Sequence, residues 1–293
     1  MKLITEDEVR EVLTMREAVG LMRETFTALR NGSAINQARR RLVLPTGSVL
    51  HSLAGAWGNY FGTKVYATHP KHGAHFYFLL FDAATAKPLA RFEANWLGQI
   101  RTGAASGYAT DLLSHPEAAS LAVIGSGFQA RSQLDAIREV RRLTDVRVWS
   151  RDEQKRNQFA TETGATAVAT PEEAVRGAQI VVTATSAKEP VLDAAWVAPG
   201  AHVNAIGSNN AQRRELPPEL IARADLIAVD SIEQAKLESG DLLLAPVSWN
   251  DSRIVELAQV ERRPDGDPLT IFKSNGLGVE DVAVAASVYE RLS

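Results

Sequence analysis

The stretch from residue 121 to residue 130 constrains the fold of this chain more than any other. Four apolar residues precede the sequence Gly-Ser-Gly-Phe-Gln-Ala, and a helical pattern continues from there to Val140. In this fingerprint, G-x-G-x-x-A, Gly125 permits a tight turn, Gly127 lets the backbone approach a pyrophosphate, and Ala130 lets the helix pack closely on the strand. The N–H groups of the first helical turn would hold the phosphates. The stretch therefore predicts a dinucleotide-binding turn formed by Gly125, Ser126, Gly127, Phe128, Gln129 and Ala130.

After this turn, short apolar runs alternate with polar segments of helical length. Between two of the runs, residues 170–173 (Thr-Pro-Glu-Glu) have the pattern of a capping box with proline at the first helical position. Strands separated by helices of this length favour a parallel, doubly wound sheet, so we predict an α/β fold with a Rossmann-type sheet. An α/β domain that binds no nucleotide is the alternative. The predicted strands are 121–124, 146–150, 165–169, 180–185, 202–207 and 226–230.

Composition and charge exclude several classes of protein. The 293 residues include no cysteine, which excludes disulfides, thiolate metal sites and thiol nucleophiles. The net charge of −3 gives no indication of binding to nucleic acid or to an anionic membrane. No apolar run has the length of a membrane span, and no signal-peptide core follows Met1. We therefore expect a cytoplasmic protein that contacts neither nucleic acid nor membrane.

The two ends of the chain differ in character from the middle. Capping boxes at 5–8 and 14–17 predict two consecutive helices, and a further helical pattern covers 96–113. The last segment, 278–292, has apolar residues at helical spacing and is expected to return to the N-terminal part. The predicted strands at this end are 39–45, 48–53, 62–68 and 75–82. We expect a smaller α+β domain built from residues 1–114 and 274–293, and a dinucleotide-binding domain at residues 115–273.

Six motifs follow one another in an order and spacing that together are specific. They are Gly62 to Val65 with His69-Pro70, Arg101 to Ser106, Gly125 to Ala130, His202 to Ser208, Val229 to Ser231, and Asn275 to Ala283. In these motifs, over nearly its whole length, the chain resembles the ornithine cyclodeaminase/mu-crystallin family. The resemblance implies a Rossmann domain with a substrate and dimerisation domain, hence a homodimer. It also implies an enzyme that moves a hydride between nicotinamide and the α-carbon of an amino or imino acid.

The resemblance assigns recognition of the substrate carboxylate to cations. Lys64 and Arg101 match the family's carboxylate-binding positions; Arg101 can form two parallel N–H bonds, whereas Lys64 is a compact point charge. The family has a further arginine upstream, where this chain has three in a row. Strand alternation would put Arg39 and Arg41 on one face and Arg40 on the other. We take Arg39 first and Arg41 second, and leave the contribution of Arg40 open.

The predicted catalytic residues are Asp230 and Lys64. Asp230 ends the sixth predicted strand, at the edge where open α/β sheets bind ligands, and matches the family's catalytic aspartate. A carboxyl group there can hold a substrate ammonium or iminium and pass a proton to the nitrogen. Asp230 could also cap the helix that begins near Ile232.

The residues after the second predicted strand bear on the choice of dinucleotide. An acidic residue there would bind the ribose hydroxyls of NAD, whereas Ser150 and Arg151 suit a 2′-phosphate. Asp152 follows, so NAD(H) stays open while NADP(H) is favoured. The other predicted cofactor contacts are Thr185, Gly207 and Ser208, and Leu277 and Gly278 in the family segment that closes over the nicotinamide.

One departure from the family separates the possible activities. The cyclodeaminase type of pocket has an acidic residue upstream of the lysine that holds the distal amine of ornithine, and this region of the chain has His51, with His72 and His75 expected nearby. A histidine does not favour a second ammonium group, so we expect an imino acid or ketimine reductase, or an amino-acid dehydrogenase. The first alternative is ornithine cyclodeaminase, which yields proline and ammonia and recycles NAD. The second is a non-catalytic protein that binds NADP(H) and a small ligand.

Two further sets of polar residues receive no functional role. His69, His72 and His75 recur at intervals of three, but no convincing set of metal ligands accompanies them, so we expect no metal site. Glu238 and Asp241 are expected at the surface.

Overall fold

The structure, a computed structural model, describes residues 1–293 and divides the chain into two compact units. The first unit comprises Met1–Ala104 and Gly276–Ser293, and the second comprises Ala105–Asn275. The sequence placed the first boundary at residues 114 and 115, whereas the units meet inside helix α3, Asn95–Leu113. The helix α3 is continuous across this division, and the first proline after it is Pro116. The sequence therefore contains no earlier sign of a domain boundary.

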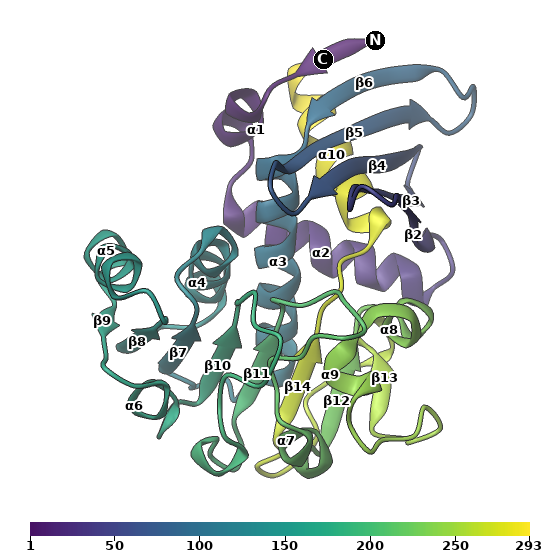
Figure 1. Ribbon diagram of the computed structural model, residues 1–293. Helices are drawn as coiled ribbons and strands as arrows, with labels where there is room; N and C mark the ends of the chain where they lie inside the picture. The colour runs from purple at the N-terminus through teal and green to yellow at the C-terminus, as the bar shows by residue number, and fades with distance from the viewer. The chain divides into compact units, whose positions relative to one another are not determined.

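The first unit contains a six-stranded sheet in the order β1-β6-β5-β4-β3-β2 (Figure 1). Strands β2 to β6 form an antiparallel meander, and β1 pairs with β6 in parallel. The strands are β1 Lys2–Ile4, β2 Ile35–Val43, β3 Val49–Trp57, β4 Tyr60–His69, β5 Gly73–Asp82 and β6 Pro88–Glu93. Strands β1 and β6 were not predicted, while both predicted capping boxes are confirmed at the starts of α1, Glu6–Val12, and α2, Met15–Arg30.

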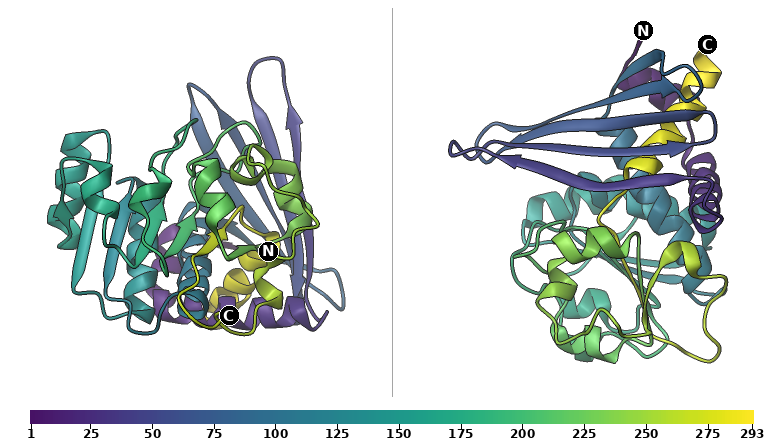
Figure 2. Two further views of the ribbon diagram at one scale, coloured as in Figure 1. Left: turned by 90° about the horizontal axis from the view of Figure 1, so that it is seen from below. Right: turned by 90° about the vertical axis from the view of Figure 1, so that its right-hand side faces the viewer.

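The C-terminal helix α10, Gly278–Leu292, packs against β3 and β4 of this sheet (Figures 1 and 2). Its bounds match the predicted segment, and its residues from Gly278 to Ala286 are buried. Two glycines allow the close approach. A Cβ on Gly55 of β3 would lie 2.5 Å from the backbone N of Val279, and a Cβ on Gly278 would lie 2.7 Å from the carbonyl oxygen of Ala54. The start of α10 therefore lies directly against the backbone of β3.

The second unit contains an eight-stranded sheet in the order β13-β12-β14-β11-β10-β7-β8-β9, with every neighbouring pair parallel. This arrangement confirms the predicted Rossmann-type sheet. The strands are β7 Ser120–Ile124, β8 Asp145–Trp149, β9 Thr166–Ala167, β10 Ile180–Thr183, β11 His202–Ala205, β12 Leu226–Val229, β13 Ile254–Glu256 and β14 Thr270–Lys273. Strands β13 and β14 were not predicted; a short apolar run does not by itself distinguish a strand from another buried segment.

Helices and two apolar cores cover the faces of this sheet. Leu121 and Val123 of β7 pack into one core, whereas Ala122 and Ile124 pack into the other, because successive side chains of a strand point to opposite faces. A strand buried on both sides explains the continuous apolar run that the sequence shows. The helices of this unit are α4 Phe128–Val140, α5 Glu153–Thr163, α6 Pro171–Val175, α7 Pro218–Arg223, α8 Ile232–Glu238 and α9 Gly240–Leu243.

No helix of the structure has both the length and the apolar composition needed to cross a membrane.

We predict that Gly55→Ala destabilises the protein by about 1–3 kcal/mol, because the new methyl group would overlap the backbone of Val279. Chemical denaturation measures this free energy of unfolding. Gly20→Ala, in α2, is the control: a Cβ there meets nothing within 4 Å, so the change should stabilise the helix by up to about 1 kcal/mol. Equal stabilities of the two variants would contradict the close approach of α10 to β3.

Candidate functional site

The turn between β7 and α4 has the geometry that its glycines predicted. Gly125 has a φ of +120°, and a Cβ there would lie 2.4 Å from the carbonyl oxygen of Ala184. Gly127 precedes α4 and has open space where a Cβ would stand. The turn thus leaves the first N–H groups of α4 accessible to an anion, as phosphate binding requires.

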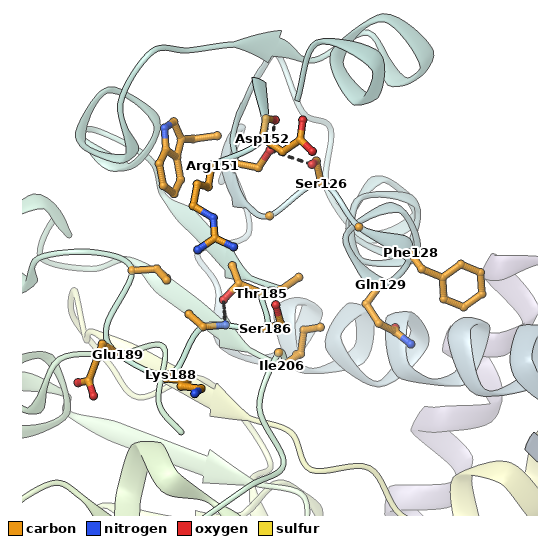
Figure 3. Close-up of a pocket in the computed structure, with 18 residues that line it drawn as sticks. Ser126, Phe128, Gln129, Arg151, Asp152, Thr185, Ser186, Lys188, Glu189 and Ile206 are labelled. Carbon is orange, nitrogen blue, oxygen red and sulfur yellow. Dashed lines mark hydrogen bonds between the residues drawn. The ribbon is translucent and has the colours of Figure 1, made fainter. Parts of the chain in front are cut away.

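A cavity of about 900 Å³ adjoins this turn (Figure 3). Nine of the predicted cofactor residues line it, namely Gly125, Ser126, Gly127, Phe128, Gln129, Ser150, Arg151, Thr185 and Gly207. Several other lining residues on the loop after β10 were not predicted, including Ala187, Lys188 and Glu189. The cavity lies where the loops after β7, β8, β10 and β11 meet, which is the carboxyl edge of the parallel sheet.

The end of β8 carries a hydroxyl, a guanidinium and a carboxylate. Ser126 Oγ donates to Ser150 Oγ at 2.8 Å, and Ser150 Oγ donates to the carbonyl oxygen of Asp152 at 3.0 Å. The Asp152 carboxylate caps α5, where it accepts from the backbone N of Lys155 at 3.0 Å. The side chain of Arg151 points into the cavity (Figure 3). Arg151 is therefore the group at this strand end that is placed to meet a ligand phosphate.

A buried carboxylate that the sequence analysis did not identify ties two cavity loops together. Glu215 accepts hydrogen bonds from Thr185 N and Oγ1 and from Gly207 N, each at 2.7 Å, and from Thr183 Oγ1 at 2.9 Å. Glu215 is fully buried, and burial raises its pKa, while the nearby Lys273 opposes the rise. One side chain thus fixes the ends of β10 and β11 where they form the cavity wall.

Asp241 holds the backbone on which Glu215 lies. Its Oδ1 accepts from the backbone N–H groups of Glu215 at 2.6 Å and Leu216 at 2.9 Å, and its Oδ2 lies 3.0 Å from Lys273 Nζ. Asp241 and Glu238 were expected at the surface, and this was wrong, since each is 1% exposed. For Asp241 the sequence pattern could not show it, because its partners lie on a distant segment and on the missed strand β14. Glu238 accepts from Gln234 Nε2 at 2.8 Å, one turn earlier in α8.

Asp230 lies directly after β12 and is buried. Its Oδ2 accepts from the backbone N of Asn275 at 2.5 Å and from Ser274 Oγ at 3.3 Å. The prediction that Asp230 could cap the following helix was wrong: the N-cap of α8 is Ser231, whose side chain accepts from Gln234 N. The carboxylate of Asp230 instead joins the end of β12 to the segment after β14.

The predicted cations of the first unit are buried together with two carboxylates from α10. Lys64 Nζ lies 3.1 Å from Asp281 Oδ1, and Arg101 Nε lies 3.3 Å from the same oxygen. Arg101 Nη1 lies 3.0 Å from Glu280 Oε2. Glu280 and Asp281 are fully buried and belong to the motif 275–283, yet the sequence analysis gave them no role.

Of the three consecutive arginines, only Arg39 is buried. A bulge between Gln37 and Arg40 interrupts the pairing of β2 with β3, so Ala38 and Arg39 are both buried while Arg40 and Arg41 are exposed. Because of this bulge, Arg39 and Arg41 do not share a face as strict strand alternation predicted. Arg39 Nη2 donates to the carbonyl oxygen of Gly276 at 3.4 Å.

His51 is a buried, neutral member of an aromatic stack. Its ring lies 4.2 Å from that of Tyr66, which in turn lies 4.8 Å from the ring of Phe76. Burial, together with the nearby Arg41 and Arg39, lowers the pKa of His51 to about 4. Its Nε2 is 3.0 Å from Thr68 Oγ1. The imidazole is therefore uncharged at neutral pH, and it lies on the same strand as Leu53, the cross-strand partner of Lys64.

Four predicted cofactor residues do not line the cavity. Ala130 is buried in the core beneath α4, and the Ser208 hydroxyl donates to the carbonyl oxygen of Arg213 at 3.2 Å. Leu277 and Gly278 belong to the first unit, where they begin α10. His72 and His75, which were expected near the substrate pocket, are exposed. No group of three or more His, Asp or Glu side chains is arranged to hold a metal ion.

Comparison with known proteins places the chain among its relatives. The sequence profile of the ornithine cyclodeaminase/mu-crystallin family matches residues 1–293. The chain is 38% identical to the ketimine reductase mu-crystallin of Mus musculus over 226 residues, which cover 76% of this chain and 71% of the relative.

Solved structures resemble the whole chain. A probable ornithine cyclodeaminase from Bordetella pertussis Tohama I has a TM-score of 0.93 and 32% identity, with 100% of this chain and 97% of that chain covered. A Δ1-pyrroline-2-carboxylate reductase from Thermococcus litoralis, in complex with NADH and L-proline, has a TM-score of 0.93 and 28% identity, with 99% and 97% covered. The chain belongs to the ornithine cyclodeaminase/mu-crystallin family.

Proposed function

We propose that this protein is an NAD(P)-dependent oxidoreductase that reduces the C=N bond of a small α-imino acid or oxidises the matching amino acid. The observation that carries the proposal is the buried set of Arg39, Lys64 and Arg101 in the first unit, in which Lys64 and Arg101 pair with the carboxylates of Glu280 and Asp281. Buried cations that include an arginine able to form two parallel hydrogen bonds suit a substrate carboxylate. The named activities of the mouse and Thermococcus relatives support a reductase.

The two units would divide the work. The second unit would bind the dinucleotide, with the pyrophosphate at the turn of Gly125 and Gly127, where the open space at Gly127 fits a close ligand. When bound, the reduced nicotinamide supplies the hydride that the α-carbon accepts. The first unit would bind the substrate carboxylate through Lys64 and Arg101. Asp230 would hold the substrate nitrogen and give it the proton that balances the hydride.

The surroundings of His51 favour an imino acid reductase over an ornithine cyclodeaminase. A diamino acid needs an anion near its distal ammonium group, and the stack of His51, Tyr66 and Phe76 offers only neutral rings. A non-catalytic binding protein is the remaining alternative. A protein that only binds its ligand does not require a proton donor, so the buried carboxyl group of Asp230 favours an enzyme.

We predict that the purified protein oxidises NADPH with at least one cyclic or open-chain α-imino acid, such as pyrroline-2-carboxylate, piperideine-2-carboxylate or pyruvate with methylamine. The loss of NADPH absorbance measures the reaction. Asp230→Asn should lower kcat by a factor of about 100 or more, since proton donation contributes on this scale. Glu219→Gln, an exposed change on α7 outside the cavity lining, is the control. Proline and ammonia from ornithine without net oxidation would instead establish the cyclodeaminase.

The dinucleotide is proposed to be NADP(H), because the Arg151 side chain enters the cavity while the adjacent carboxylate, Asp152, caps α5. We predict that Arg151→Ala weakens NADPH binding by a factor of about 10 or more, while NADH binding changes little. Isothermal titration with each dinucleotide measures both affinities. Arg142→Ala removes the same charge from an exposed position outside the cavity lining and should change neither. Equal losses for the two dinucleotides would contradict the assignment.

A homodimer is proposed through the open face of the first unit's sheet. Lys64 and its cross-strand neighbours Leu53 and Phe78 are buried on one face, so the residues that alternate with them point to the other. That other face carries Leu42, Leu50 and Tyr77, which are 59%, 44% and 47% exposed. An apolar sheet face of this kind indicates an association surface.

We predict that Leu50→Asp converts the dimer to a monomer, because a charge in the middle of an apolar interface is not compensated. Light scattering after gel filtration measures the mass. Leu237→Asp, at a position 54% exposed on α8, is the matched control and should leave the mass unchanged. An unchanged mass for Leu50→Asp would exclude this face.

A further inference from the structure

We propose that Asp281 is a positioning residue that holds Lys64 and Arg101 together in the geometry that receives a substrate carboxylate. This inference rests on the proposed function of that site. One oxygen, Asp281 Oδ1, lies 3.1 Å from Lys64 Nζ and 3.3 Å from Arg101 Nε. Glu280 holds the other end of the guanidinium through Nη1 at 3.0 Å. The adjacent acids on α10 thus orient cations from two other elements, β4 and α3.

The backbone leaves these cations little freedom to move. A Cβ on Gly98 would lie 2.4 Å from Lys64 Nζ, so the amine lies directly over the backbone of α3. A Cβ on Gly276 would lie 2.5 Å from Arg101 Nη1. Asp281 is itself fixed, because the start of α10 is pressed against β3. Lys64 and Arg101 are therefore held between backbone and carboxylates before any ligand arrives, as a preorganised binding site requires.

Asp281 is also the only carboxylate in contact with Lys64. The charged groups around the Lys64 amine are Asp281 from α10, Arg101 from α3 and Arg39 from β2, and the Phe76 ring of β5 lies 5.6 Å from Nζ. Burial lowers the pKa of Lys64 to about 8, Asp281 opposes this, and both arginines add to it. Removal of the Asp281 charge would leave a buried amine between two guanidinium groups, which favours its neutral form.

The pH dependence of substrate binding follows from this arrangement. Lys64 is protonated below its pKa and then attracts the substrate carboxylate, so the KM for the imino acid should be constant at lower pH and rise above about pH 8. In Asp281→Asn the rise should begin at least about one pH unit lower. The KM should then be about twofold higher at pH 7 and about tenfold higher at pH 9, with a smaller change in kcat and no change in dinucleotide affinity.

The experiment combines these kinetics with a titration that needs no substrate. The NMR signals of ¹³C-labelled lysine side chains report the titration of Lys64, assigned by its loss in Lys64→Arg. Glu290→Gln is the control variant: it removes a negative charge from an exposed position on the same helix and can keep the contact to Tyr60. Glu280→Gln, which removes the carboxylate that contacts Arg101 Nη1 and Leu277 N, should move the Lys64 titration less than Asp281→Asn does.

A lower titration midpoint of Lys64 in Asp281→Asn, with native cofactor binding, would support the proposal. An unchanged midpoint and an unchanged KM profile would overturn it, and so would equal shifts in Asp281→Asn and Glu290→Gln. If Asp281→Asn does not fold, Asp281→Glu and Glu280→Gln provide the comparison, and the proposal fails if neither moves the midpoint. A shifted midpoint in a protein that reduces no imine would refute the proposed function while the role of Asp281 stands.

Discussion

The first unit depends on the direct contact between the start of α10 and the backbone of β3. Glycines at 55 and 278 remove the side chains that would keep the helix away. Because the helix approaches so closely, its first turn buries Glu280 and Asp281 beneath the sheet. Buried carboxylates need partners, and Lys64 and Arg101 supply them. One steric condition thus brings the C-terminus of the chain into the candidate substrate site.

The cavity of the second unit is built from loops rather than from strands, so its shape depends on contacts that hold those loops in place. Loops at the carboxyl edge of a parallel sheet are held only by what their side chains and backbone groups can bond to. Here Glu215 binds the loops after β10 and β11, Asp241 holds the backbone N–H of Glu215, and Lys273 pairs with Asp241. The arrangement keeps the cavity wall in place before a ligand is bound. It also explains why Glu215, Asp241 and Lys273 can be buried, since each has polar partners.

Local patterns predicted a large share of both units. Capping boxes, the turn at Gly125 and the helical spacing of residues 278–292 each involve residues close in sequence, and each was confirmed. Strand β14 was missed although Thr270, Ile271 and Phe272 favour strands, because a run this short does not by itself distinguish a strand from another buried segment. The surface assignment of Asp241 failed because a charged residue becomes a core residue only when a distant partner such as Lys273 is present.

The sequence by itself determined the family, the Rossmann-type sheet, the glycine turn after β7 and the buried cations Lys64 and Arg101, since these are written in short motifs or in periodic patterns. Only the tertiary structure decided which of the three arginines is buried, because a bulge in β2 displaces the alternation that the sequence implies. Only the tertiary structure joined Asp281 to Lys64 and Arg101, and Glu215 to Thr185 and Gly207. Such contacts link residues far apart in the chain, and nothing in their local sequence encodes the partner.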